Sequence, residues 1–150
     1  MYKHSKGFTL IELIATMVIA SILASSLITG YRTYNEWLKV NEEILNMVNT
    51  LRQARDYCIE ANENFYLSID TGADTYTLEY KTANNALNLP GQNDNVFTMP
   101  SFVDFTASTV GTDLKFNILG EPTEGATITI NTDERTIEIV YPTGYIYAHN

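Results

Sequence analysis

Cysteine is almost absent from this 150-residue chain, which contains only Cys58. A single cysteine cannot form an internal disulfide, so the sequence excludes a disulfide-stapled secreted domain. Two roles remain open for Cys58, a buried apolar thiol or an intermolecular link. Burial is the favoured interpretation, because a free cysteine behaves as a small hydrophobic side chain.

Basic residues are also scarce, and the net charge is −9. From Glu63 to the end, the chain contains twelve acidic residues but only three basic ones, Lys81, Lys115 and Arg135. Binding to phosphates or to an anionic lipid surface needs clustered lysine and arginine. The charge balance therefore argues against direct nucleic-acid binding.

No group of residues in the sequence resembles a catalytic or metal centre. The only histidines, His4 and His149, lie near the two ends of the chain. A hydrolytic site needs a nucleophile, a base and an orienting group, and neither a phosphate-binding glycine loop nor zinc-ligand spacing occurs here. The stretch "NTDE", residues 131–134, lacks the spacing of a calcium loop and is typical of a hairpin turn. We therefore predict no enzyme activity, no cofactor and no metal.

The N-terminal region contains a long apolar run, Phe8 to Gly30, with Glu12 as its only charged residue. These 23 residues are enough to span a bilayer as a helix. The positive charges of Lys3 and Lys6 place the N-terminus in the cytoplasm and the rest of the chain outside. A cleaved secretory signal peptide and a plain signal anchor both fit the apolar run, but neither gives Glu12 a purpose.

The stretch "KGFTLIEL", residues 6–13, resembles the processing site of type IV pilins and pseudopilins. The resemblance implies a leader from Met1 to Gly7, cleavage between Gly7 and Phe8 by a prepilin peptidase, and methylation of the new N-terminal Phe8. It also implies that Glu12 neutralises the methylated amine of a neighbouring subunit during filament assembly. The implied partners are other pilin or pseudopilin subunits, the peptidase, the membrane and an inner-membrane assembly platform.

The helix is expected to continue beyond the apolar run, from about Thr9 to about Ala61, because residues 31–61 contain neither proline nor glycine. An apolar stripe with helical spacing marks the face toward a core, formed by Val40, Ile44, Met47, Val48, Leu51 and Cys58. Arg55 projects from this apolar side, so it must snorkel or find a partner. Four segments follow: a leader at 1–7, a membrane or filament-core half at 8–30, an amphipathic half at 31–62 and a β-rich extracellular head at 63–150.

Alternating apolar and polar residues predict several strands in the head. The segments "NFYLSID" and "TYTLEYK" flank "TGAD" as one β-hairpin, and "ATITINT" and "RTIEIVY" form a second. Short strands are expected near Phe102–Thr106, Leu114–Asn117 and "TGYIYA", and the Asn-rich residues 81–95 are expected to form a surface loop. The predicted fold is α+β, with a long N-terminal helix packed on an antiparallel sheet.

Further residues resemble H-type minor pseudopilins and their FimT-like relatives, as well as D-type pseudopilins of competence machines. They are "LRQARDYC" from Leu51, "FNILGEPTEG" from Phe116 and the closing hairpin with Gly144. Some FimT-like relatives bind DNA through basic residues near the tail, but the tail of this chain has none beyond His149.

The resulting hypothesis is a minor pilin or pseudopilin, a structural subunit of a type IV-like filament. Type II secretion, a type IV pilus and a DNA-uptake machine all use such subunits. The chain would be a single-pass membrane protein before assembly and part of a filament afterwards. Two alternatives are a membrane-anchored module that captures an extracellular ligand without assembling, and a secreted enzyme with a classical signal peptide.

Overall fold

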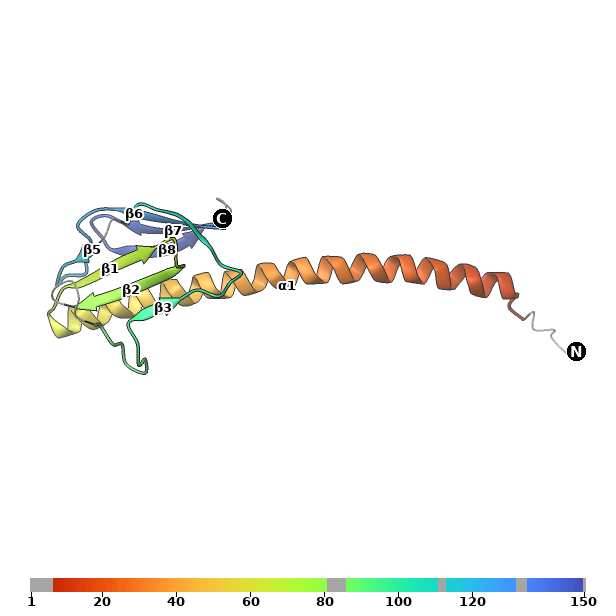
Figure 1. Ribbon diagram of the computed structural model, residues 1–150, viewed down its shortest axis with the longest axis horizontal. Helices are drawn as coiled ribbons and strands as arrows, with labels where there is room; N and C mark the ends of the chain where they lie inside the picture. The colour runs from red at the N-terminus through yellow and green to blue at the C-terminus, as the bar shows by residue number, and fades with distance from the viewer. Residues whose placement is uncertain (1–6, 81–85, 111–112, 132–134, 150) are drawn as a thin grey trace, which may run out of the picture. The chain divides into compact units, whose positions relative to one another are not determined.

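The structure, a computed structural model, describes residues 7–80, 86–110, 113–131 and 135–149. Two compact units divide the chain, one up to Lys39 and the other from Val40 onward. One helix, α1 (Leu10–Ala61), begins in the first unit and ends in the second (Figure 1). It agrees with the helix predicted from about Thr9 to about Ala61.

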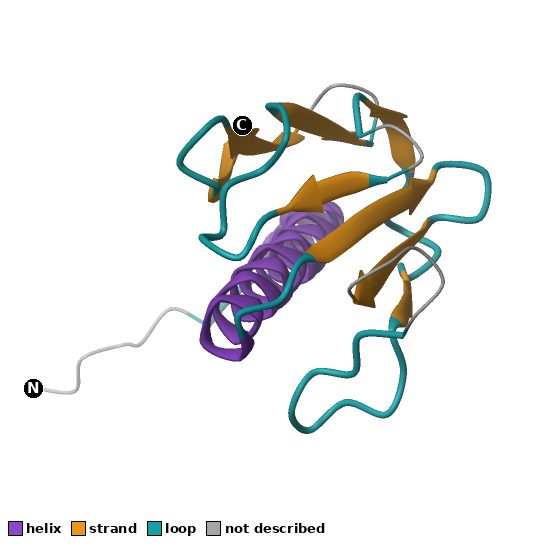
Figure 2. Cartoon of the chain, turned by 90° about the vertical axis from the view of Figure 1, so that its left-hand side faces the viewer, coloured by secondary structure: helices purple, strands orange, loops and turns teal. Residues whose placement is uncertain are grey.

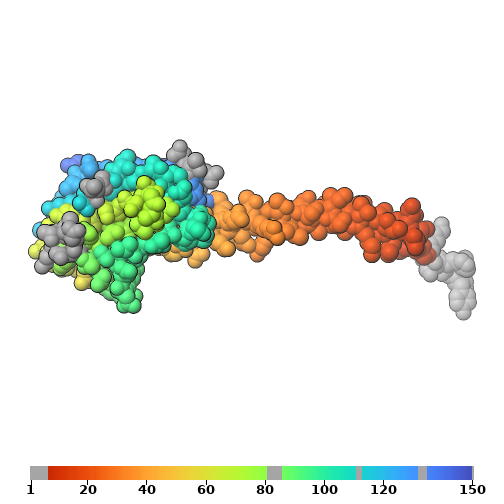
Figure 3. All heavy atoms as spheres, viewed as in Figure 1, coloured from red at the N-terminus to blue at the C-terminus, as the bar shows by residue number. Residues whose placement is uncertain are grey.

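In the first unit, the residues of α1 are uncovered. Every residue from Gly7 to Tyr34 is exposed, and the red and orange spheres of Figure 3 show this stretch as a single rod of side chains. The helix is long and apolar enough to cross a membrane. Six hydroxyl groups in it donate to carbonyl oxygens three or four residues earlier, those of Thr16, Ser21, Ser25, Ser26, Thr29 and Thr33. Such internal bonds satisfy the polar groups that lipid cannot.

In the second unit, α1 turns one face toward a core. Its buried residues are Val40, Ile44, Met47, Val48, Leu51, Ala54 and Cys58. This set confirms the predicted apolar stripe and adds Ala54 to it. The adjacent Arg52 donates from Nε to the carbonyl oxygen of Ile146 at 2.9 Å, and its guanidinium lies 5.5 Å from the centre of the Tyr145 ring.

Within the described residues, eight strands form two four-stranded antiparallel sheets. The first has the order β3 (Val96–Thr98), β2 (Thr75–Tyr80), β1 (Phe65–Asp70) and β5 (Leu114–Phe116). The second has the order β4 (Phe105–Ser108), β6 (Ala126–Ile130), β7 (Arg135–Val140) and β8 (Tyr145–His149). Figure 2, viewed along α1, shows the strands over one side of the helix.

The inward faces of both sheets and the buried face of α1 share one core. Residues alternate between buried and partly exposed along β6 and β7, as the predicted hairpin requires. Phe65 of β1 stacks on Phe116 of β5 with ring centroids 4.3 Å apart. The long-range pairing of β1 with β5 therefore brings two fully buried aromatic rings together.

The predicted α+β fold, a long N-terminal helix packed on antiparallel strands, is confirmed, but the strands divide between two sheets rather than one. Alternation along the sequence identifies a strand and its inward face but not its neighbours. Here β5 pairs with β1, whereas β4, which comes just before it in the chain, pairs with β6. The partner of each isolated strand is decided by packing of side chains far apart in sequence.

The prediction for residues 81–95 was also partly wrong. Residues 81–85 lie outside the described part of the chain, but Leu87 and Leu89 are buried, at 2% and 1% exposed. The backbone N–H of Leu87 donates to the carbonyl oxygen of Leu78 at 3.1 Å. This segment is therefore held to β2 by a backbone hydrogen bond and places two leucines in the core, rather than lying wholly on the surface.

Two further strands differ from the sequence prediction. β4 begins at Phe105 instead of Phe102, since backbone groups of residues 102 and 104 are bound by the side chain of Asn131. β3 was not predicted at all, and it is only three residues long. A strand this short shows no alternation to detect, and it exists because it pairs with β2.

Cys58 lies in the core, as expected, with 1% of its surface exposed. Burial, assisted by the negative charge of Glu63, raises the pKa of its thiol to about 11. The thiolate is the reactive form, so we expect folded protein at pH 8 to react with iodoacetamide roughly a hundredfold more slowly than an exposed cysteine. A Cys58→Ser, Gln53→Cys variant supplies that exposed thiol on the outer face of α1.

The same pKa shift has a consequence for stability. The folded state holds the thiol proton up to about pH 11, whereas the reference pKa is 9.0. The free energy of unfolding should therefore fall as pH rises between these values, because only the unfolded state releases the proton.

Rapid alkylation of Cys58 in the native protein at pH 8 would contradict its placement in the core.

Candidate assembly site

The start of α1 places Thr9 and Glu12 in direct contact. Thr9 is the last residue before the helix, and Glu12 lies in its first turn. The backbone N–H and the hydroxyl of Thr9 each donate to Oε2 of Glu12 at 2.9 Å. The backbone N–H of Glu12 donates in return to Oγ1 of Thr9 at 3.3 Å. These reciprocal bonds form a capping box, which satisfies otherwise unpaired N–H groups at a helix start.

The capping role of Thr9 was missed at the sequence level, although its signal was present. A threonine followed three residues later by glutamate, directly before an apolar run, is the pattern of a capping box. Both bonds from Thr9 end on Oε2 of Glu12, and an ionised carboxylate can accept several hydrogen bonds on its two oxygens. Capping therefore leaves Glu12 able to accept a further cationic donor.

The residues named as a processing site are accessible. Phe8 is 86% exposed, and a side chain placed on Gly7 would meet no atom within 4 Å. Leu10 and Ile11, which follow directly, are also mostly exposed. An apolar helix surface of this kind needs lipid or other apolar helices around it, since contact with water is unfavourable.

A second group of contacts lies around Arg55 and joins the segments that resemble H-type minor pseudopilins. Its Nε donates to the carbonyl oxygen of Gly120 at 3.1 Å, and its Nη2 donates to that of Thr143 at 3.2 Å. Arg55 therefore finds the partners that its position on the apolar side required. The "LRQARDYC" segment, the "FNILGEPTEG" turn and the last hairpin, far apart in sequence, are joined by this one guanidinium.

Gly120 and Gly144 allow this close approach. Their φ angles are 76° and 64°, in the left-handed region that favours glycine. A side chain at Gly144 would overlap the carbonyl oxygen of Gly120, and one at Gly120 would lie 2.7 Å from Arg55 Nε. The two turns can contact each other and α1 only because both positions lack a Cβ atom.

His149 is the one described histidine, and its surroundings do not form a catalytic relay. It is exposed, and its Nε2 lies 2.8 Å from Thr136 Oγ1 and 3.6 Å from Glu138 Oε2. A relay uses one ring nitrogen for the nucleophile and the other for the acid, whereas here a single nitrogen meets both groups. Glu138 also accepts a 2.6 Å bond from Tyr147, and this bond raises the pKa of the tyrosine.

Among the residues that the structure describes, no three histidine, cysteine, aspartate or glutamate side chains gather as a metal site would require. The predicted "NTDE" turn falls largely outside the described residues, which include only Asn131 of the four. His4 likewise lies outside them. Asn131 has a φ of 51°, and its side chain binds the backbone of Phe102 and Asp104.

Comparison with known proteins gives one match to the N-terminal segment and several matches to the fold. Residues 2–28 match the family model described as the prokaryotic N-terminal methylation motif. The type IV minor pilin FimU of Pseudomonas aeruginosa is similar in structure, with a TM-score of 0.57, 11% identity, and coverage of 78% of this chain and 92% of FimU. A search of curated protein sequences gave no match.

The minor pseudopilin EpsH, from the type 2 secretion system of Vibrio cholerae, is similar to the same degree. Its TM-score is 0.56 at 17% identity, with coverage of 73% of this chain and 95% of EpsH. The chain therefore combines a match to the N-terminal methylation motif with a fold similar to that of a minor pilin and a minor pseudopilin, a long helix packed on antiparallel sheets.

Proposed function

We propose that this chain is a structural subunit of a type IV-like filament, inserted in the membrane by its N-terminal helix and then assembled through it. One observation carries the proposal: residues 2–28 match the methylation motif, and the apolar half of α1, which starts at Leu10 within that match, is exposed on every side. In a soluble monomer this apolar surface would be in contact with water, which is unfavourable. A membrane, and after assembly a bundle of similar helices, would cover it.

The proposed maturation removes Met1 to Gly7 on the cytoplasmic side and leaves Phe8 as the methylated N-terminus. The exposure of Gly7 and Phe8 supports access by a prepilin peptidase. The new amine of Phe8 would then be paired with Glu12 of a neighbouring subunit in the apolar bundle. An assembly platform in the inner membrane would bring the two subunits together.

We further propose a minor subunit of the H-type, or FimT-like, group, with a D-type competence pseudopilin as the alternative within the class. The convergence of Arg55, Gly120 and Gly144 supports this assignment, because the scattered residues that suggested it form a single contact in space. The proposed role is mechanical and lies in subunit contacts rather than in catalysis.

The N-terminus of the mature protein tests the proposal most directly. Mass spectrometry of protein isolated from its native membrane should find a chain beginning at N-methylated Phe8. Replacing Gly7 with valine should leave the protein at precursor length, since a branched side chain obstructs approach of the peptidase to the backbone. A mature chain that begins beyond residue 20, with the apolar run removed, would instead indicate a classical signal peptide.

A further inference from the structure

Three aromatic residues follow the apolar run on α1, and the role proposed above does not use them. Tyr31, Tyr34 and Trp37 are 66%, 58% and 45% exposed. Their spacing of three residues places them along one side of the helix. The rings of Tyr34 and Trp37 stack, with centroids 6.2 Å apart and planes 10° from parallel. We call these three residues the aromatic belt.

The position of the aromatic belt along α1 matches the thickness of a bilayer. Leu10 to Gly30 rises about 30 Å at 1.5 Å per residue, which equals the hydrocarbon core. Past Gly30, Tyr31 lies about 1.5 Å, Tyr34 about 6 Å and Trp37 about 10 Å further along the axis, and each headgroup layer is roughly 5 to 7 Å thick. With the helix start at one face of the hydrocarbon, Tyr31 and Tyr34 lie at the level of the opposite headgroups and Trp37 lies at their outer edge.

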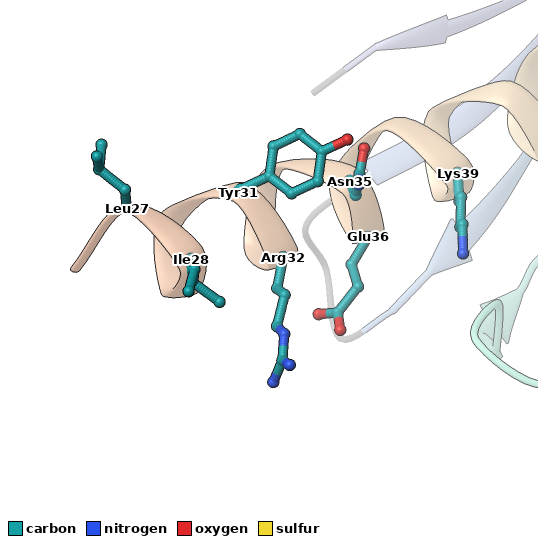
Figure 4. A pocket seen from close by; sticks show the side chains of 7 residues that line it. All are labelled: Leu27, Ile28, Tyr31, Arg32, Asn35, Glu36 and Lys39. Carbon is teal, nitrogen blue, oxygen red and sulfur yellow. The ribbon is translucent and has the colours of Figure 1, made fainter. Parts of the chain in front are cut away.

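The side chains around Tyr31, the belt residue that lines a groove on α1, change from apolar to charged along the helix. A shallow groove on this part of α1 is lined first by Leu27 and Ile28, next by Tyr31 and Arg32, and then by polar or charged residues as far as Lys39. Figure 4 shows these side chains in that order. An apolar, then aromatic, then charged sequence is the profile of a membrane–water boundary.

The charges in this groove favour lipid over a protein partner as its occupant. Arg32 and Lys39 can bind lipid phosphates while their stems remain against apolar surface. The core of a protein interface, by contrast, is depleted of lysine and glutamate, and both Lys39 and Glu36 line the groove. The groove is also continuous with the apolar run that the membrane covers.

We propose that the aromatic belt is the outer-leaflet anchor of the unassembled subunit. It binds the headgroup region of phospholipids and sets the depth of the helix in the bilayer. This inference rests on the membrane insertion in the proposed function and adds the residues that fix the outer boundary.

The chain contains one tryptophan, so fluorescence reports directly on the belt. The full chain is reconstituted at low density in phosphatidylcholine vesicles that carry a spin label either on the headgroup or near the end of the acyl chain. Because belt tryptophans lie at headgroup level, we expect the headgroup label to quench Trp37 roughly threefold more than the deep label. Vesicle flotation verifies insertion first, so a chain that does not float refutes the membrane anchor itself.

Two variants calibrate the measurement. Trp37→Phe with Ile19→Trp places the probe in the middle of the apolar run, and Trp37→Phe with Gln53→Trp places it on an exposed position of the second unit. Trp37 quenched like the Ile19 probe, or quenched only by aqueous acrylamide like the Gln53 probe, would overturn the proposal. Protection from both lipid labels and acrylamide would also overturn it, because a second protein helix would then cover the belt.

Discussion

Replacing Glu12 with glutamine should strongly reduce incorporation into the filament while leaving membrane insertion and leader cleavage intact. Glutamine still accepts the Thr9 N–H in a capping box, so the start of the helix is preserved. It cannot neutralise the amine of a neighbouring Phe8, and a charge left unpaired among apolar helices is costly. We expect the filament fraction, measured by shearing and immunoblotting, to fall roughly a hundredfold, in line with the cost of an unpaired intramembrane charge.

Thr9→Val is the matched control for this experiment. It removes the hydroxyl that donates to Glu12 and accepts from its backbone, yet it keeps the carboxylate. The loss of one capping interaction costs about 1 kcal/mol of helix stability, so we expect only a moderate reduction in assembly. Equal defects in the two variants would show that capping, and not charge pairing, is the role of Glu12. Normal assembly of Glu12→Gln would contradict charge pairing as the role of Glu12, whereas absence of the unsubstituted chain from the filament fraction would favour a membrane-anchored binding module.

Replacing Gly144 with alanine should strongly destabilise the head. Its φ of 64° is unfavourable for alanine, by about 1 to 2 kcal/mol. The added methyl group would also overlap the carbonyl oxygen of Gly120, beside the Arg55 guanidinium, and overpacking of this kind costs roughly 1 to 3 kcal/mol. We expect a total loss of about 3 kcal/mol, measured by denaturant unfolding of the full chain in detergent and followed by near-ultraviolet circular dichroism.

Gly72→Ala provides the comparison. Gly72 lies in the turn between β1 and β2, where an added Cβ would meet only Asp70 Oδ1 at an ordinary 3.4 Å. Its backbone is outside the left-handed region, so the substitution should change the free energy of unfolding by less than about 0.5 kcal/mol. Similar effects at Gly72 and Gly144 would contradict the close contact between the two turns.

The helix and the methylation motif at its start were predictable because their signals are local. The apolar run, the single charge at Glu12 and the residues preceding Phe8 are contiguous in the sequence. The apolar stripe from Val40 to Cys58 repeats at helical spacing, and all of its predicted members are buried. The two hairpins were equally clear, since each joins strands that are neighbours in the chain.

The pairings between distant segments were not predictable in the same way. Nothing near β5 in the sequence indicates that it pairs with β1, and the three residues of β3 show no pattern of their own. Leu87 and Leu89 lie in an Asn-rich stretch, yet both are buried. In each case, burial of apolar surface against distant residues stabilises the observed structure and outweighs the preference of the local composition.

The sequence by itself determined that the chain has a membrane-length helix that matches an N-terminal methylation motif, a carboxylate in its first turn and a β-rich region after it. These features depend on composition and on spacings of a few residues, which the chain carries locally. Only the tertiary structure decided that the strands form two sheets and that Arg55 binds the carbonyl groups of Gly120 and Thr143. Those contacts join residues 65 and 88 positions apart, and they form only when the whole core closes.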